Sequence, residues 1–493
     1  MDMMKFLLFI FLITIHGKFS SASSLKPELA PSIKKLLKDS ELTEEQVSFH
    51  IEEIKSDAII ESHNSNVEFT PASVTKILTS YYALKHLPLN ESFDTELYLD
   101  VKSQSSGSYK GDLYIVGKGN PYLGTQDLFE MAISLKLMGI KKLNGNIYFD
   151  DYYFPTIQVI NVLGEHDHTY NSTISPLSIN FNRFNIWREG DSSGRKGNFF
   201  TIPPVKTLKI SKSNGPFPVG TKFLNKSTGP DIEEWSLSKL QKYHQKEKLP
   251  LRNPALTTAS LLEYFLNLTG VETDVKILRK DHTDQGELIS TKNAPNNKQM
   301  LKWTLEFSNN LFAETLLFQT NLIRNKKAHD LIDASRHMIE WFKLRMKKTS
   351  FEKVKIINGS GLTSENKMSA KFIVDVLKLA ERDIEMKQKL WPLLTVSGAT
   401  GWFKKRLDDH ELTYKVWAKT GNLDYVSAIS GYLISKSNKH YAFSILTQDD
   451  KKRKILDIEN NLKTERLKKL AYKWKSESFD LQNAIIRHWY YSY

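Results

Sequence analysis

One stretch decides the fold of this chain: Pro71-Ala-Ser-Val-Thr-Lys-Ile-Leu-Thr-Ser-Tyr-Tyr-Ala-Leu84. Proline suits the entry of a helix, and the apolar residues from Ile77 onward recur at helical spacing, so the stretch predicts a helix packed on a core. Ser73 and Lys76 stand three residues apart and would share one face of that helix. A hydroxyl beside an amine on a rigid helix is the arrangement that an acyl-transfer nucleophile needs.

The Ser-x-x-Lys spacing is common in this chain and decides nothing by itself. It recurs at six other places: Ser23/Lys26, Ser32/Lys35, Ser193/Lys196, Ser236/Lys239, Ser350/Lys353 and Ser364/Lys367. A solvated lysine at a helix start is the plain alternative, because short motifs often match by chance. The case for Ser73 therefore depends on the rest of the chain.

Length and composition narrow the class of protein. A chain of 493 residues exceeds what one hydrophobic core supports, so two or three domains are expected. The net charge of +13 favours anionic partners, but the chain contains no nucleic-acid-binding motif and we predict no nucleic-acid partner. The absence of cysteine excludes disulfides, thiolate catalysis, zinc-finger spacings and a lipid-modified N-terminal cysteine.

The N-terminus predicts export. Lys5 precedes the apolar run 6–15, and small residues occupy 20–24, which is the order of a secretory signal, so 1–22 is predicted as a signal peptide. The run is too short for an ordinary spanning helix, although Asp2 beside Lys5 leaves an uncleaved anchor as an alternative. A large exported chain without disulfides indicates the bacterial periplasm. Peripheral membrane contact and the oligomeric state stay open.

Periodicity and breaker residues predict the remaining elements. Further helices are expected over 31–38, 127–138, 257–268, 299–323 and 455–474, and strands over 47–54, 58–62, 95–101, 113–116, 146–149, 207–210, 354–357, 416–418, 428–434 and 441–446. Residues 151–255 read as mixed strand and loop. Gly117-x-Gly119 lacks the remaining parts of a dinucleotide fingerprint and predicts a turn. The aromatic tail 488–493 is expected to pack on the domain.

Two further short motifs carry polar chemistry. Ser308-Asn-Asn310 interrupts the apolar pattern of 299–323, either as a helix-to-helix corner capped by Ser308 or as part of a polar site. Lys419-Thr-Gly421 occurs once, with strand character on both sides. Its glycine either ends the strand in a turn or allows a substrate backbone to approach the strand edge.

In this order, the three motifs resemble those of the penicillin-recognising serine acyl-transferases. More than two hundred residues separate Ser73 from Ser308, which resembles the class C low-molecular-mass penicillin-binding proteins, a family of D-alanyl-D-alanine carboxypeptidases and endopeptidases. Five other stretches are similar to family signposts: Gly111-Asp-Leu-Tyr114, Gly119-Asn-Pro-Tyr-Leu123, Asn144-Gly-Asn-Ile147, Asn358-Gly-Ser-Gly-Leu362 and Ser397-Gly-Ala-Thr-Gly401. Asn358 departs from the aspartate that is usual in the family.

The resemblance implies an α+β fold with a transpeptidase-like (β-lactamase-like) domain, in which helices cover an antiparallel sheet. That domain would be discontinuous, formed by 23–94 and 292–493. Residues 95–291 would form the β-rich insertion typical of the family, as one subdomain or two.

The resemblance also implies a mechanism for hydrolysing peptidoglycan stem peptides or their cross-links. Ser73 would attack the carbonyl of the penultimate D-alanine to form an acyl-enzyme. Lys76 would take its proton, which requires a lowered pKa that desolvation and Lys419 both favour. Ser308 would relay a proton to the leaving amine, and Asn310 would hold the substrate amide and orient Lys76. β-Lactam antibiotics would act as covalent inhibitors.

The third motif would bind the substrate. Lys419 and Thr420 would hold the substrate carboxylate, and Gly421 would allow close approach along the strand. The backbone N–H groups of Ser73 and Asn422 would form the oxyanion hole. No metal or cofactor is needed for this chemistry.

Three alternatives remain at this point. A serine β-lactamase would need an efficient deacylation base, usually a glutamate between the second and third motifs, and none is evident in the sequence. A catalytically silent wall-binding protein is disfavoured because all three motifs are intact. The choice between carboxypeptidase and endopeptidase is left open, because the two activities share this chemistry.

Overall fold

The computed structural model describes residues 29–190, 197–213, 215, 217, 221–229, 231–238, 244–347, 349–458 and 465–493. The predicted signal peptide at 1–22 lies outside the described residues. No helix in the described ranges is long and apolar enough to cross a membrane.

A six-stranded antiparallel sheet forms the centre of one half of the molecule, in the order β16-β17-β18-β19-β1-β2. Its strands are β1 (Val47–Glu53), β2 (Ile59–His63), β16 (Thr395–Val396), β17 (Val416–Leu423), β18 (Val426–Ile434) and β19 (His440–Gln448). The sheet joins the two ends of the chain, because Val47 of β1 pairs with Thr447 of β19. The expected antiparallel sheet is therefore present.

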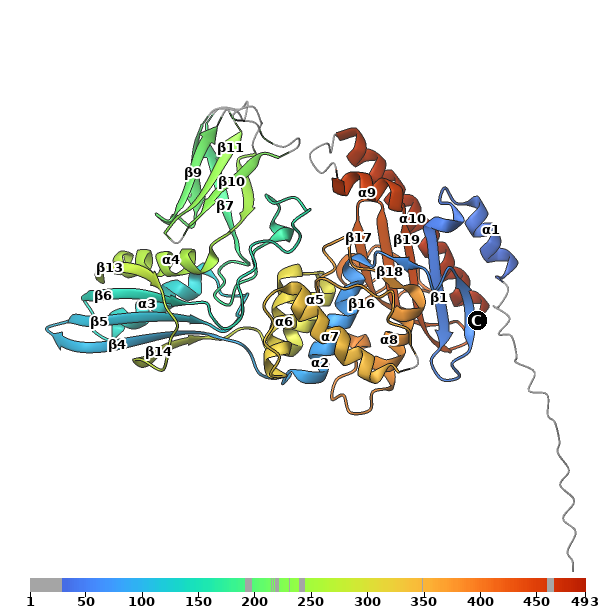
Figure 1. Ribbon diagram of the computed structural model, residues 1–493, viewed down its shortest axis with the longest axis horizontal. Helices are drawn as coiled ribbons and strands as arrows, with labels where there is room; N and C mark the ends of the chain where they lie inside the picture. Colours follow the sequence, from blue (N-terminus) through green and yellow to red (C-terminus); the bar gives the residue numbers. More distant parts are fainter. Residues whose placement is uncertain are drawn as a thin grey trace, which may run out of the picture.

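Helices cover both faces of this sheet (Figure 1). Alternate residues of β18 belong to two separate cores, with Ala428 and Tyr432 in one and Ile429 and Leu433 in the other. The first core is shared with α2 (Lys76–His86), α5 (Asn297–Glu306), α6 (Asn310–Ile323), α7 (Leu331–Arg345) and α8 (Ala370–Arg382). The second is covered by α1 (Pro31–Asp39) and α10 (Glu465–Ser492), with α9 (Asp450–Ile458) at its edge.

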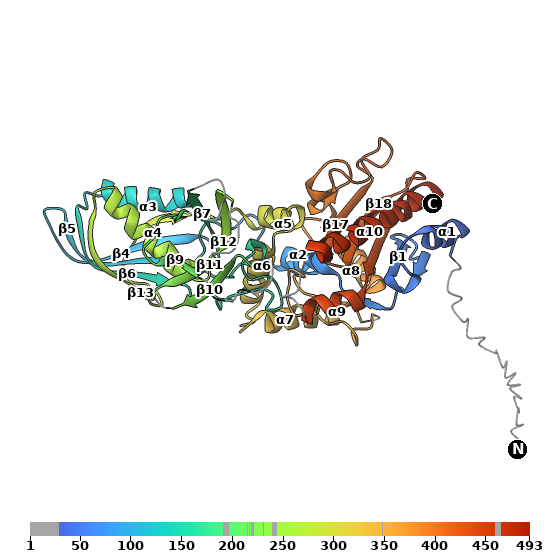
Figure 2. The same cartoon turned by 90° about the horizontal axis from the view of Figure 1, so that it is seen from above.

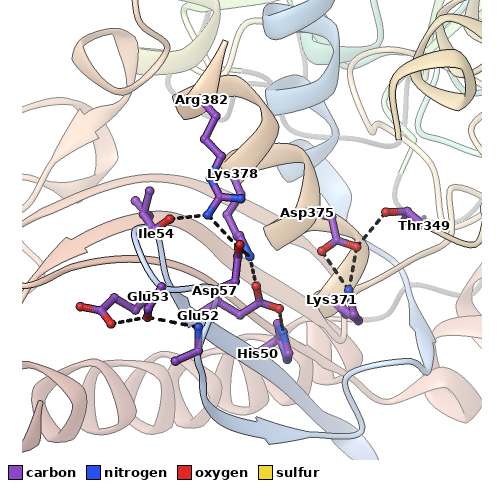
Figure 3. Close-up of polar contacts among 12 residues, drawn as sticks. His50, Glu52, Glu53, Ile54, Asp57, Thr349, Lys371, Asp375, Lys378 and Arg382 are labelled. Atoms are coloured by element: carbon purple, nitrogen blue, oxygen red, sulfur yellow. Dashed lines mark hydrogen bonds and ion pairs between the residues drawn. The ribbon is translucent and has the colours of Figure 1, made fainter. Parts of the chain in front are cut away.

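An ionic cluster with buried members (Glu52 and Lys378) and exposed ones (Asp57 and Arg382) ties α8 to the first strand (Figure 3). Lys378 is paired with both Glu52 of β1 and Asp57, and Arg382 contacts Asp57. His50 Nε2 lies 2.7 Å from Glu52 Oε1. Burial opposes ionisation of Glu52, but the hydrogen bonds from His50 and Lys378 together lower its pKa to about 2. The carboxylate therefore stays charged and paired under the helix.

The segment between β3 (Glu68–Phe69) and α5 contains, besides α2, a projecting insertion (Figures 1 and 2). Its five-stranded sheet has the order β13-β6-β5-β4-β14, and two three-stranded sheets have the orders β12-β7-β8 and β10-β11-β9. One continuous apolar core runs through all of these sheets and their two helices. The elements are β4 (Thr95–Ser105), β5 (Ser108–Gly117), α3 (Thr125–Leu137), β6 (Lys142–Asp150), β7 (Arg183–Glu189), β8 (Asn198–Ile202), β9 (Leu208–Ser213), β10 (Phe223–Thr228), β11 (Glu233–Ser238), β12 (Lys246–Pro250), α4 (Pro254–Leu268), β13 (Glu272–Arg279) and β14 (Glu287–Lys292).

Three sequence-based expectations need correction. The helix expected over 299–323 is two helices, α5 and α6, because the backbone turns at Ser308 with φ 55°. The strand expected over 354–357 is reduced to a single bridge from Lys355 to Lys367 beside the short pair β3 and β15 (Met368–Ser369). The range 455–474, expected as one helix, covers the end of α9 and the start of α10. Residues 459–464 lie outside the described residues.

The aromatic tail packs on the domain, as expected. Trp489 and Tyr490 of α10 are buried in the second core, and the indole N–H of Trp489 donates to Glu61 at 2.7 Å. The end of the chain is therefore held against the start of the central sheet.

Candidate active site

Ser73 lies on a short 3-10 turn, Ala72–Thr75, directly before α2 and not within a regular α-helix. Ala72 adopts φ 46°, a conformation that a residue with a side chain rarely takes. Gly361 allows its own backbone to pack closely against this turn, because a Cβ at that position would lie 1.8 Å from Ala72 O. Ser73 stays partly exposed while Val74 and Thr75 are buried, so the turn presents one hydroxyl to the surface.

Lys76 is fully buried and points back at Ser73. Its Nζ lies 3.0 Å from Ser73 Oγ, 2.7 Å from Asn310 Oδ1 and 2.6 Å from the carbonyl oxygen of Ser360. Burial, and then the charge of Lys419, hold the pKa of Lys76 well below its usual range, against a smaller opposing effect of Glu314. Burial and the charge of Lys419 therefore both favour the neutral amine over the ammonium.

Ser308 and Asn310 stand at the corner between α5 and α6. Asn309 caps α6, because its side chain accepts from the N–H of Phe312, so the cap expected at Ser308 is wrong. Ser308 Oγ is instead free to accept from Lys419 Nζ at 2.9 Å. Asn310 faces Lys76 on one side and donates to the carbonyl of Tyr170, in the insertion, on the other. The helix-to-helix corner and the polar site, which the sequence left as alternatives for 308–310, are thus the same feature.

The third motif lies inside β17 and does not end the strand. Lys419 is buried, donates to Thr420 O at 2.6 Å, and has its pKa lowered to about 7 by burial. Gly421 packs directly on the turn that carries Ser73, because a Cβ there would lie 2.7 Å from Pro71 O and Ser73 N. The glycine thus allows β17 itself to approach the nucleophile turn.

These contacts bring all eight predicted residues to one place: Ser73, Lys76, Ser308, Asn310, Lys419, Thr420, Gly421 and Asn422. Ser73, Ser308, Thr420 and Asn422 line a cavity of about 300 Å³. A larger cavity of about 740 Å³ shares Ser308 and extends towards the insertion over Asn310 and Tyr170. Within the described ranges, no group of three His, Cys, Asp or Glu residues is arranged to hold a metal.

Sequence reasoning missed Glu314, which stands behind the site. It is fully buried on α6, and its two oxygens accept from the N–H groups of Gly359 at 2.9 Å and Ser360 at 2.7 Å. The carbonyl of the same Ser360 holds Lys76. Burial raises the pKa of Glu314, and the hydrogen bonds from this turn oppose the rise. A charged residue in the apolar pattern of α6 was the signal that could have revealed it.

We expect Glu314→Gln to lower the free energy of unfolding by about 1–3 kcal/mol, the cost of leaving one buried N–H unpaired. The N–H groups of Gly359 and Ser360 donate to different oxygens of Glu314, and the amide replaces one of these oxygens by an NH₂ group that cannot accept. Urea unfolding measures the change, and the exposed Glu340→Gln on α7 is the matched control. Equal stability of the two variants would contradict this account of the turn.

Comparison with known proteins agrees with this geometry. The D-Ala-D-Ala carboxypeptidase 3 (S13) family matches residues 29–465. The chain is 24% identical over 446 residues to a D-alanyl-D-alanine carboxypeptidase of Haemophilus influenzae, covering 86% of this chain and 91% of that protein. It is 25% identical over 419 residues to a D-alanyl-D-alanine carboxypeptidase of an Actinomadura species, covering 78% of this chain and 74% of that protein.

The fold has a close counterpart among solved structures. Penicillin-binding protein 4 from Haemophilus influenzae, complexed with a β-lactam, superposes with a TM-score of 0.71 at 19% identity, covering 94% of this chain and all of that one (100%). The predicted α+β fold class and the predicted class of enzyme, a serine-type D-Ala-D-Ala carboxypeptidase, are confirmed. The resemblance drawn from the three motifs is confirmed as well, and the chain belongs to the D-Ala-D-Ala carboxypeptidase 3 (S13) family.

Proposed function

We propose that this protein is a serine D-alanyl-D-alanine carboxypeptidase or DD-endopeptidase, with Ser73 as nucleophile and Lys76 as its base. The observation that carries the proposal is the set of partners around Lys76 Nζ. Two of them, Asn310 Oδ1 and Ser360 O, are carbonyl oxygens that only accept hydrogen bonds. A neutral amine that donates to both directs its lone pair at the third partner, the Ser73 hydroxyl.

Acylation follows from this arrangement. Ser73 Oγ attacks the carbonyl carbon of the penultimate D-alanine while Lys76 Nζ takes the hydroxyl proton. The C–N bond then breaks, and the leaving nitrogen receives a proton from Ser308, which is replenished by Lys419. With its pKa near 7, Lys419 can give up a proton close to neutral pH. The product is an ester of Ser73 and a free amine.

The open edge of β17 supports substrate binding. Among the described strands, β16 pairs with β17 only at Trp417 and Ala418. The edge of β17 from Lys419 onward is therefore not paired with β16 and is open to the cleft. An extended peptide can add to such an edge. The N–H groups of Ser73 and Asn422 would stabilise the oxyanion, each worth about 3–4 kcal/mol in the transition state.

Water completes the cycle. Once Lys76 has lost its proton to solvent and Lys419 has regained one from solvent, Lys76 takes a proton from the attacking water and returns it to Ser73 Oγ as the ester breaks. Glu314 lies between the second and third motifs but does not serve as a β-lactamase base, because both of its oxygens already accept backbone N–H groups. This disfavours rapid deacylation and favours β-lactams as covalent inhibitors.

We also propose that the chain is exported to the bacterial periplasm, where peptidoglycan stem peptides are its substrates. The N-terminal pattern at 1–22 and the absence of cysteine support this placement. We assign the catalytic domain to 23–94 and 292–493, with 95–291 inserted, because one apolar core consists of residues of 95–291 alone. Phe154, Ile160 and Ile174 of the insertion pack instead into a core of the catalytic domain.

The test is digestion of purified muropeptides, monomeric and cross-linked, followed by mass spectrometry. Release of the terminal D-alanine from the monomer establishes a carboxypeptidase, and cleavage of the dimer establishes an endopeptidase. Rapid turnover of nitrocefin would instead indicate a β-lactamase. Intact muropeptides of both kinds after prolonged incubation would contradict the proposal.

A further inference from the structure

The cavity at Ser73 contains a cation outside the three motifs. Arg406 follows a 3-10 turn, Gly401–Phe403, and lines the same cavity of about 300 Å³ as Ser73 and Thr420. Phe479 from α10 lines the same cavity. The guanidinium thus reaches the nucleophile's cavity from a separate part of the fold.

Neutral groups of α10 hold this guanidinium in place. Nε and Nη2 donate to Asn483 Oδ1 at 3.1 and 2.8 Å, and Nη2 also donates to Gln482 Oε1 at 3.2 Å. The guanidinium carbon lies 4.5 Å from the centre of the Phe479 ring. The side chain is therefore fixed along one edge before any substrate binds.

The charge of Arg406 has no carboxylate in direct contact within the described residues. Asp480 attracts it only from a distance, and burial lowers its pKa to about 10, so it stays charged at neutral pH. Its remaining nitrogen, Nη1, has no hydrogen-bond partner in the described parts of the chain, yet it is not fully buried. Nη1 can therefore donate to an anion that enters the cavity lined by Arg406.

We propose that Arg406 binds the carboxylate carried by the leaving residue of the substrate, next to the scissile nitrogen. The inference rests on the proposed function, because it names a specificity-determining residue of that site. In a stem peptide that carboxylate belongs to the terminal D-alanine. In a cross-link it belongs to the diamino acid that supplies the scissile nitrogen. Thr420 lines the same cavity and offers a hydroxyl to the same group.

Other cations near the cleft are less suited to this role. Lys419 already contacts Ser308 and Thr420 O, and the described contacts of Lys475 include the face of Tyr472 at 5.2 Å. A guanidinium binds a carboxylate in a planar, directional way that an ammonium does not. We therefore expect Arg406 to distinguish a free carboxylate from a carboxamide.

The test compares two acyl-D-Ala-D-Ala peptides that differ only in a C-terminal carboxylate or carboxamide. The wild-type protein should prefer the carboxylate in kcat/KM. Arg406→Gln should lower kcat/KM for the carboxylate peptide about 10- to 100-fold, with little change for the carboxamide, so that the preference collapses. Lys405→Gln, on the same turn and exposed, removes the same charge without reaching the cavity and should keep the preference.

An equal loss for both peptides in Arg406→Gln would assign Arg406 a purely structural role and overturn the inference. If circular dichroism shows that Arg406→Gln does not fold, the same comparison of the two peptides is made with Arg406→Lys. Arg406→Lys keeps the positive charge but not the planar guanidinium, so it should retain part of the preference for the carboxylate peptide. Equal losses of kcat/KM on both peptides would again overturn the inference. If the wild-type protein cleaves neither peptide, the proposed function itself fails, and this inference fails with it.

Discussion

Ser73→Ala is expected to abolish covalent labelling by a fluorescent penicillin and to lower hydrolysis of a D-Ala-D-Ala peptide by about 10⁴- to 10⁶-fold. Without the hydroxyl no ester forms, although the cavity and its oxyanion donors persist. The turn before α2 should survive, because the Ser73 side chain is partly exposed and its one described hydrogen-bond partner is Lys76. Labelling measured on a gel and hydrolysis measured by mass spectrometry test the two effects.

Ser350→Ala is the matched control for this experiment. Ser350 and Lys353 share the Ser-x-x-Lys spacing, but Ser350 is exposed and lines a separate cavity with Glu68 and Lys371. This variant should label like the wild-type protein. Persistent labelling of Ser73→Ala at full strength, with native circular dichroism, would show that another residue is the nucleophile.

Lys76→Met should slow acylation by penicillin about 10²- to 10⁴-fold, the usual contribution of a general base. Methionine matches the length and apolar stem of the buried lysine, so the core around α2 keeps its packing. What disappears is the lone pair directed at Ser73 Oγ, 3.0 Å away. Stopped-flow acylation rates, compared with unfolding curves, separate loss of the base from loss of the fold.

The pH dependence of the wild-type rate provides an independent check on Lys76. A protonated ammonium has three donors and no lone pair, so acylation should fall as the pH is lowered through the depressed pKa of Lys76. Lys76→Met should lose that dependence, and Lys353→Met on the surface should keep it. A wild-type acylation rate that is flat down to acid pH would exclude Lys76 as the base.

Local patterns in the sequence were enough to find the central strands and the three motifs. The mostly apolar runs 428–434 and 441–446 lie within β18 and β19, because strands buried on both faces are rich in apolar residues along their length. The order of Ser73, Ser308 and Lys419 identified the family, because each motif combines residue type with a local structural context. The corner at Ser308 was visible as polar residues in an apolar helix pattern.

Local pattern could not reveal contacts that form only when distant segments meet. In the sequence, Glu314 is only a charge at an apolar position, and the fold shows that it accepts from the 359–360 turn. In the sequence, Gly421 is consistent with a strand end, and the fold shows that β17 packs there on Pro71 and Ser73. In the described part of the chain, the strand expected at 354–357 pairs at one position, Lys355 with Lys367, and that pairing depends on a segment outside its local pattern.

By itself, the sequence determined the class of protein and identified the proposed reacting groups, because those depend on residue type and spacing. The tertiary structure alone decided the environment of those groups. Lys76 is suited to the proposed role of base only because folding buries it between two carbonyl oxygens and beside Lys419, and Arg406 reaches the cavity only because α10 holds it there. Desolvation and long-range pairing are properties of the assembled core, so no local pattern encodes them.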